Sequence, residues 1–211
     1  MHTGTLSQSA QDALALLGKS QCLPSKTYLA GGSALALHYG HRISVDFDFF
    51  TPTIFKGKTI MKLLQSIGNF EFQEAAEKNT LLGMFNKVKF SLFLYDYPVI
   101  FKPTIFKGIA VLNPKDIAAM KIAAVMDRGT KKDFIDLYFL NKNKIAFEFM
   151  FKFYDKKYKM FANNLYSIIT SLSYFDDAEK TTIPEMIEKL SWEEVKEFFK
   201  NEVVRLAHKY L

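Results

Sequence analysis

The chain has 211 residues, enough for one large domain or two small ones, and its 49% hydrophobic and 24% charged residues are ordinary for a globular protein. A single cysteine, Cys22, excludes an intramolecular disulfide and a cysteine-based zinc cluster. The net charge of +6 permits a phosphate-rich partner without requiring one.

The N-terminal residues lack the basic start and the apolar run of a signal peptide. The longest apolar stretches are interrupted by Lys, Asp or Gly well before the about 20 residues that a membrane-spanning helix needs. We therefore expect a cytoplasmic protein with no membrane partner.

Periodicity and turn residues predict both helices and strands in the first half of the chain. The predicted helices are Ser7–Leu17, a helix capped by Ser33 that runs to Tyr39, and Lys58–Ile67. The predicted strands are Thr27–Ala30, Val45–Phe50, Phe70–Ala76, Thr80–Phe85, Val88–Tyr95 and Ile109–Leu112. This order predicts a mixed sheet with helices against it.

After Asn113-Pro114 only helices are predicted, because Asn caps a helix well and Pro suits its first position. They cover Ile117–Met126, Lys131–Leu140, Phe147–Tyr158, Phe161–Tyr174, Ile183–Leu190 and Trp192–His208. We expect an α+β fold, with a sheet-containing domain over residues 1–113 and a helical domain over 114–211 packed against it.

The segment from Gly31 to Asp48 has the residue types that bind a nucleoside triphosphate. Gly31 and Gly32 follow a predicted strand, where glycine lets a ligand approach the backbone, and the next helix points its N-terminus at the same spot. On the following strand, Asp46 and Asp48 are two residues apart and therefore leave the same face. Paired carboxylates suit Mg²⁺ or Mn²⁺, which also holds substrate phosphates.

Each feature also has a simpler interpretation. A Gly-Gly turn is common, and two aspartates on an exposed strand face are often only solvated. The combination, within one short segment, of a strand, Gly-Gly-Ser, one helix, Arg42, Ser44 and the two aspartates favours the functional interpretation.

This pattern resembles the DNA polymerase β-like nucleotidyltransferases and, more closely, the AbiEii/AbiGii toxins of type IV toxin–antitoxin systems. The first motif of that toxin family matches residues 31–35 and 42–48. Later motifs match Lys121-Ile-Ala-Ala and Arg128-Gly-Thr-Lys-Lys-Asp-Phe-Ile-Asp-Leu, so the resemblance covers about residues 27 to 140.

The resemblance implies a nucleotidyltransferase-like fold and a site that transfers a nucleoside monophosphate to an acceptor hydroxyl, such as that of a tRNA 3′ end. It implies that Asp46 and Asp48 bind the metal, and that the nucleotide is held by Gly32, Ser33, Arg42, Ser44, Lys121, Arg128 and Lys132. Lys121 and Asp133 then join the two aspartates as catalytic residues. A cognate antitoxin is the expected protein partner.

The second group of residues also has a structural alternative. Lys121 and Arg128 lie seven residues apart on one predicted helix and could simply be solvated. Lys132 and Asp136 could form a surface ion pair, and Asp133 could be an acid favoured by the helix dipole in the first turn.

One position departs from the family pattern. Polymerase β-like enzymes commonly use a third carboxylate on a neighbouring strand, and here Ser91 occupies that place. An alternative function is therefore a catalytically impaired nucleotidyltransferase fold that binds a nucleotide or a protein, and a third is a purely structural protein.

The remaining candidates are favoured as structural residues. His38 and His41 flank a helix end, and Trp192 and the segment Phe147–Phe153 are expected in the core. The lysines from Lys142 to Lys159 could contact an acceptor's backbone, but a solvated helix face is the favoured interpretation.

Overall fold

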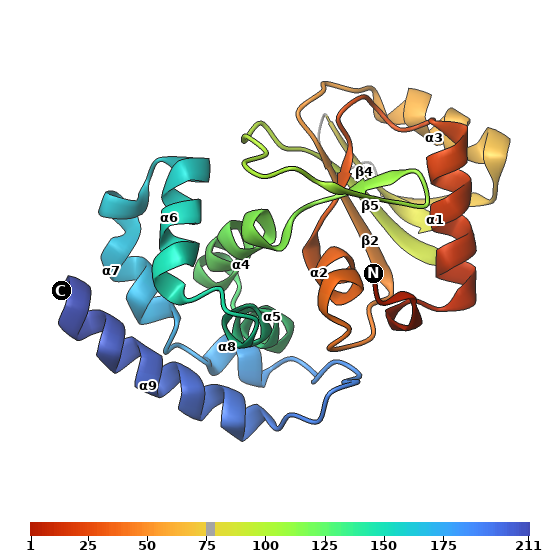
Figure 1. The fold of residues 1–211 in the computed structure, drawn as a ribbon. Helices are drawn as coiled ribbons and strands as arrows, with labels where there is room; N and C mark the ends of the chain where they lie inside the picture. The colour runs from red at the N-terminus through yellow and green to blue at the C-terminus, as the bar shows by residue number, and fades with distance from the viewer. Residues whose placement is uncertain (75–78) are drawn as a thin grey trace. The chain divides into compact units, whose positions relative to one another are not determined.

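The computed structural model describes residues 1–74 and 79–211 of the chain. It contains two compact units, Met1–Asn113 and Pro114–Leu211 (Figure 1). The first unit combines a β-sheet with helices, and the described residues of the second form helices joined by loops. The chain therefore has the mixed α/β architecture that the sequence predicts.

The sheet of the first unit has seven strands in the described residues, in the order β3-β4-β5-β2-β1-β7-β6. Their bounds are β1 Tyr28–Leu29, β2 Asp46–Thr51, β3 Phe70–Glu74, β4 Thr80–Phe85, β5 Val88–Leu94, β6 Thr104–Phe106 and β7 Ile109–Val111. β1 pairs parallel to β7 and β2 parallel to β5, whereas the other neighbours are antiparallel. The sheet is therefore mixed, and β2 lies inside it.

The helices of this unit are the short 3₁₀ helix η1 Thr3–Thr5, α1 Gln8–Ser20, α2 Gly31–Tyr39 and α3 Gly57–Ile67. Ser7 caps α1, its hydroxyl accepting a hydrogen bond from the Ala10 amide at 3.2 Å. α1 contacts β5 and β7, and α3 contacts β3 and β4. Amphipathic helices thus cover the apolar side chains of the sheet.

Alternation along β2 and β5 separates two faces of the sheet. Phe47, Phe49 and Phe90 are fully buried, with the rings of Phe49 and Phe90 centred 5.4 Å apart. Asp46 and Asp48 leave the opposite face, as period two requires. Packing of the phenylalanines therefore fixes the direction in which both carboxylates point.

The second unit contains α4 Pro114–Asp127, α5 Lys131–Lys142, α6 Phe147–Tyr158, α7 Phe161–Ser171, the one-turn α8 Asp176–Glu179 and α9 Trp192–Tyr210. α4 contacts α5, α6 and α7, and α9 contacts α5 and α7. The rings of Phe134 and Phe199 are 5.0 Å apart and those of Phe147 and Phe199 are 5.8 Å apart, so aromatic contacts hold this core together.

Three predicted elements differ in the structure. Residues 183–190 are not helical. Ile183 and Ile187 are about half exposed, so no buried apolar stripe supports a helix there. α7 ends at Ser171, three residues early. Ser33 is not the cap, because α2 begins at Gly31.

The short edge strand β6 was not predicted, and residues 75 and 76 of the predicted third strand lie outside the described part of the chain. In the described ranges, no helix combines the length and the apolar character that a membrane crossing requires.

Candidate functional site

The two aspartates of β2 lie beside the start of α2. Gly31 has a left-handed backbone, with φ of +62°, and a Cβ atom added to it would lie 2.9 Å from Asp48 Oδ2. The Asp48 carboxylate therefore rests against the first residue of α2. The first amides of a helix have no partner within it, and Ala30 at the cap position provides no side-chain hydrogen bond. A carboxylate thus lies at a helix N-terminus, a place where backbone amides suit an anion.

Replacing Gly31 with Ala should disturb this arrangement. An Ala side chain at positive φ costs about 1–2 kcal/mol, and here it also pushes the Asp48 carboxylate away. We expect a lower melting temperature and weaker binding of Mg²⁺-nucleotide, measured by thermal denaturation with and without ligand. Gly4→Ala is the matched control, because its Cβ would meet nothing within 4 Å. Equal behaviour of the two variants would contradict the role given to Gly31.

Arg42 is buried against Gly32. A Cβ on Gly32 would collide with Arg42 Nη2, and Arg42 Nη1 donates a hydrogen bond to the Ile43 carbonyl at 3.2 Å. Arg42 is only 2% exposed, so the guanidinium is held in the wall of the site. Gly32 is needed for this close approach.

Ser33 and Ser44 join α2 to the segment that leads into β2. The hydroxyl of Ser33 donates to Ser44 Oγ at 2.8 Å and also contacts the Asp46 carbonyl oxygen. Both serines are buried. In this structure they position the helix and the strand, and their contact with a nucleotide remains a prediction.

Ser91 faces Asp48 from the neighbouring strand, as the sequence predicts. Parallel pairing of β2 with β5 places Asp46 beside Lys89 and Asp48 beside Ser91. Within the described residues, no group of three or more His, Cys, Asp or Glu side chains could hold a metal ion. The two carboxylates nevertheless suit Mg²⁺, which takes one or two carboxylates and completes its shell with water and phosphate oxygens.

The helical unit holds a second cluster, around Lys121. Its ammonium lies 2.8 Å from Asp133 Oδ1 and 2.6 Å from Asp136 Oδ2. Lys121 is 6% exposed, and the two aspartates are 1% and 0% exposed. The alternatives of a solvated Lys121 and a surface pair between Lys132 and Asp136 are therefore wrong. The side chain of Asp136 is directed at α4, where Lys121 is its partner.

Asp133 also holds Arg128 and the start of α5. Its Oδ2 accepts from Arg128 Nε at 3.2 Å and from the Thr130 hydroxyl at 2.7 Å. Burial alone would raise the pKa of Asp133, but the charges of Lys121 and Arg128 and the hydrogen bonds from Lys121 and Thr130 hold it well below its usual range. The carboxylate is thus ionised at neutral pH. The side chain of Arg128 is 63% exposed and is the outward-facing member of the cluster.

The depressed pKa of Asp133 has a consequence for acid stability. A carboxyl group whose pKa is lower in the folded state stabilises the fold above its unfolded pKa of about 4, and the effect is lost as pH falls through the folded value. We expect Asp133→Asn to be clearly destabilised at pH 7 and to approach the wild type near pH 2, as measured by urea denaturation. Asp127→Asn is the control, because Asp127 is exposed, and its free energy of unfolding should stay near that of the wild type at both pH values.

Lys132 is exposed in the first turn of α5.

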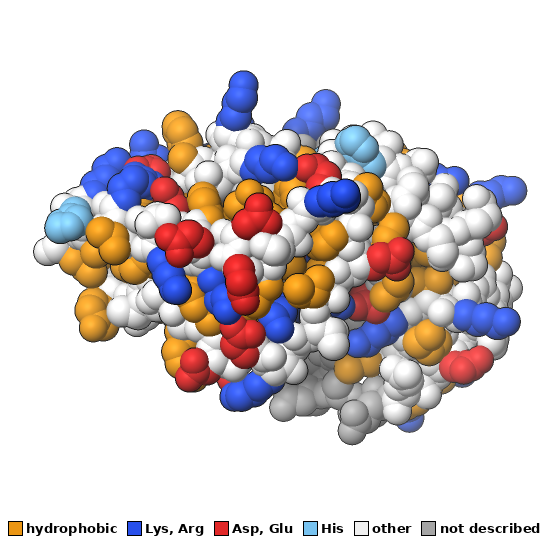
Figure 2. Space-filling view, turned by 90° about the horizontal axis from the view of Figure 1, so that it is seen from below, with side chains coloured by type: hydrophobic (Ala, Val, Ile, Leu, Met, Phe, Trp, Pro, Cys, Tyr) orange, Lys and Arg blue, Asp and Glu red, His pale blue; other side chains and the backbone are white. Residues whose placement is uncertain are grey.

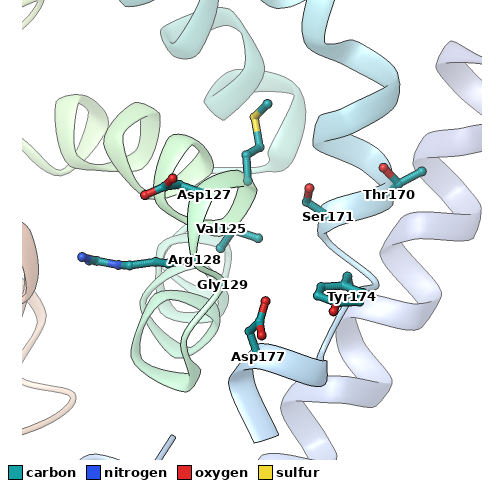
Figure 3. A pocket seen from close by; sticks show the side chains of 9 residues that line it. Val125, Asp127, Arg128, Gly129, Thr170, Ser171, Tyr174 and Asp177 are labelled. Atoms are coloured by element: carbon teal, nitrogen blue, oxygen red, sulfur yellow. The ribbon is translucent and has the colours of Figure 1, made fainter. Parts of the chain in front are cut away.

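A hollow of about 290 Å³ lies between the end of α4 and the segment that follows α7. It is lined by Val125, Met126, Asp127, Arg128, Gly129, Thr170, Ser171, Tyr174 and Asp177. In Figure 3 the side chain of Arg128 extends away from Tyr174 and Asp177, so its guanidinium is not directed into this hollow. Arg128, a member of the Lys121 cluster, thus lines the hollow without pointing its charge into it.

A family model decides the relationship of the chain to known proteins. The model for the nucleotidyl transferase AbiEii toxin of type IV toxin–antitoxin systems matches residues 20–209. The chain belongs to the AbiEii toxin family. The matched range extends well past residue 140, so the AbiEii relationship also covers most of the helices that carried little of the sequence resemblance.

One sequence relative and two solved structures are similar to this AbiEii chain. An uncharacterised protein of Aquifex aeolicus is 41% identical over 181 residues, covering 83% of this chain and 85% of the relative. The nucleotidyltransferase toxin MenT4 of Mycobacterium tuberculosis superposes with a TM-score of 0.58 at 12% identity, over 94% of this chain and 82% of MenT4. A Helicobacter pylori protein described as a candidate nucleotidyltransferase gives 0.55 at 16% identity, over 96% and 93%. The fold is thus a nucleotidyltransferase fold.

The structure of this AbiEii protein also identifies polar residues that sequence reasoning missed. Thr130 precedes Asp133 by three residues, which is the spacing of a capping box and could have been noticed. Lys157 pairs with Asp116 at 2.9 Å in the core of the helical unit, and no pattern in the sequence indicates this pair. His38 Nε2 donates a hydrogen bond to the Leu112 carbonyl, 2.9 Å away, which fits the expected local role.

Proposed function

We propose that this AbiEii toxin family member binds a nucleoside triphosphate with Mg²⁺ or Mn²⁺ at Gly31–Asp48 and transfers a nucleoside monophosphate to an acceptor hydroxyl. One observation carries the proposal: the Asp48 carboxylate lies against Gly31 at the N-terminus of α2. A metal held by Asp46 and Asp48 is then next to the place where helix amides bind phosphate.

In this proposal Asp46 and Asp48 present carboxylate oxygens from one rigid strand, and Arg42, held against Gly32, places positive charge beside the phosphates. A bound divalent metal supplies charge stabilisation and lowers the pKa of the acceptor hydroxyl. The acceptor oxygen forms a bond to the α-phosphorus, the bond to the β-phosphate oxygen breaks, and pyrophosphate leaves with that electron pair. The hydroxyl proton passes to solvent.

The helical unit contributes positive charge in this proposal. Arg128 and Lys132 are exposed, and we infer from the family motif that they contact nucleotide phosphates. Lys121 and Asp133 act as positioning residues, because the buried network fixes Arg128 through Asp133 Oδ2. We further infer an RNA acceptor, such as a tRNA 3′ end, a cytoplasmic location, and a cognate antitoxin as protein partner.

The test is to incubate the full chain with each α-labelled nucleoside triphosphate, Mg²⁺ and total RNA, and to follow label in RNA and in protein. Transfer that requires Mg²⁺ supports the proposal, and the labelled species names the acceptor. Absence of transfer to any RNA or protein, with tight nucleotide binding shown by calorimetry, would overturn it.

Ser91 favours a second candidate, a nucleotide-binding module without turnover, because a serine provides no charge for a second metal. Ser91→Asp is informative here. Without metal, a third carboxylate beside Asp48 should destabilise the unit by like-charge repulsion. With Mg²⁺, we expect a larger rise in melting temperature than in the wild type. No additional rise would show that Ser91 is not the missing ligand position.

A further inference from the structure

Four side chains on the outer face of α6 form an aromatic–lysine strip: Phe149, Lys152, Phe153 and Lys156. Their spacing of three, four and seven residues places them on one side of the helix. Phe149 is 51% exposed, and both lysines are exposed. The prediction that the whole Phe147–Phe153 segment is core is therefore wrong for Phe149, although Phe147 and Phe151 are buried.

The two rings of the strip are nearly parallel. Their centroids are 6.5 Å apart with 24° between the planes, and Lys152 Nζ lies 5.6 Å from the Phe149 centroid. Phe149 is exposed and Phe153 is half-buried, so the pair offers apolar ring surface that a ligand can cover. Flat ring faces with a cation beside them suit bases joined to phosphates.

The charge around the strip is positive. Of the acids on α6, Glu148 lies 2.6 Å from Arg205 and 2.9 Å from Lys209, and these hydrogen bonds lower its pKa to about 2. The carboxylate of Asp155 accepts the Phe161 amide at 3.2 Å. An amide hydrogen bond leaves the Asp155 carboxylate charged, so the positive charge of the strip comes from two lysines, Lys152 and Lys156, against this one acid.

The surface along α9 is different. Figure 2, seen from the side on which α9 lies in Figure 1, shows acidic and basic side chains mixed together. Lys196 pairs with Glu179 at 2.9 Å, and Arg205 pairs with Glu202 at 2.7 Å. Such a mixed surface attracts a polyanion less than a net positive one, so α9 differs in this respect from the strip on α6.

We propose that the aromatic–lysine strip is a docking surface for single-stranded RNA. Bases stack on Phe149 and Phe153, and Lys152 and Lys156 contact the phosphates on either side. The inference rests on the proposed function, because it gives the acceptor a binding surface. RNA binding itself needs neither nucleotide nor metal and can be measured without them.

The experiment is fluorescence anisotropy of a labelled 12-nucleotide single-stranded RNA with the full chain, in the absence of nucleotide and metal. Phe149→Ala should weaken binding at least about fivefold, since one stacked base contributes about 1–3 kcal/mol. Lys152→Gln and Lys156→Gln should each reduce the slope of log K against log salt by about 1. Because these side chains are exposed, melting temperatures should stay near the wild-type value.

Two variants serve as matched controls: Tyr166→Ala removes an aromatic ring that is 68% exposed on α7, and Lys200→Gln removes an exposed lysine on α9. Neither should change RNA binding. Wild-type affinity of Phe149→Ala, equal losses in the controls, or equal affinity for duplex RNA would overturn the proposal. The proposal would also be overturned if the strip variants bound RNA normally and lost binding to a protein partner instead. If the wild type and Asp48→Asn both bind RNA through the strip but the wild type transfers no nucleotide, the proposed function fails and the RNA-docking proposal stands.

Discussion

Replacing Asp48 with Asn should lower nucleotidyl transfer by at least about 100-fold while the protein stays folded. A metal ion supplies several kcal/mol of stabilisation to developing charge, and a hundredfold loss corresponds to about 2.7 kcal/mol. Asn keeps the size of Asp48, so the side chain still fits against Gly31, but it provides no negative charge for the metal. Initial rates of label transfer at saturating Mg²⁺ measure the effect.

Asp12→Asn is the control, because Asp12 is an exposed acid on α1 in the same unit. It should transfer at the wild-type rate. Calorimetry with Mg²⁺-nucleotide separates binding from turnover, and we expect weaker binding in Asp48→Asn only. A variant that retained more than a tenth of the wild-type rate would contradict the assignment of Asp48 as a metal ligand.

Lys121→Met should destabilise the helical unit by about 3–5 kcal/mol, the cost of removing one partner from a buried ion pair. The substitution leaves Asp133 and Asp136 buried on α5 without the ammonium that lies 2.8 and 2.6 Å from them. Urea denaturation, followed by circular dichroism, gives the change in the free energy of unfolding.

Lys196→Met is the matched control, since Lys196 forms its ion pairs with the more exposed Glu179 and Glu193. Surface pairs contribute about 0–1 kcal/mol, so this variant should stay near the wild type. The double variant Lys121→Met/Asp136→Leu should recover part of the lost free energy of unfolding, because it removes one of the two buried carboxylates that Lys121 had neutralised. A loss below about 1 kcal/mol for Lys121→Met would mean that the ion pairs are not formed in solution.

Local patterns predicted the strand that carries the candidate metal ligands. Alternation of Phe47 and Phe49 with Asp46 and Asp48 places the phenylalanines in the core and both carboxylates on the other face. The place of Ser91 opposite Asp48 followed from the same rule applied to β5. Period-two patterns are reliable here because one face of the sheet is buried, and a one-residue shift would expose the phenylalanines.

Long-range contacts could not be predicted in the same way. Lys121 looks like a surface lysine in the sequence, and only the packing of α4 on α5 shows that two aspartates surround it. Phe149 looks like a core residue among its neighbours, and its exposure depends on which side of α6 faces the other helices. Ile183 and Ile187 have helical spacing, but without a buried surface against them this spacing does not produce a helix.

The position of β2 in the sheet has a consequence for motion. β2 has β1 on one side and β5 on the other, and the Asp48 carbonyl accepts the Ala30 amide at 2.9 Å. Amide hydrogens in such a strand exchange with solvent only when the whole sheet opens, whereas those of the edge strand β6 exchange by local fraying. We therefore expect the backbone beneath Asp46 and Asp48 to be among the slowest-exchanging parts of the unit, so that side-chain rotamers rather than this strand adjust to whatever binds beside it.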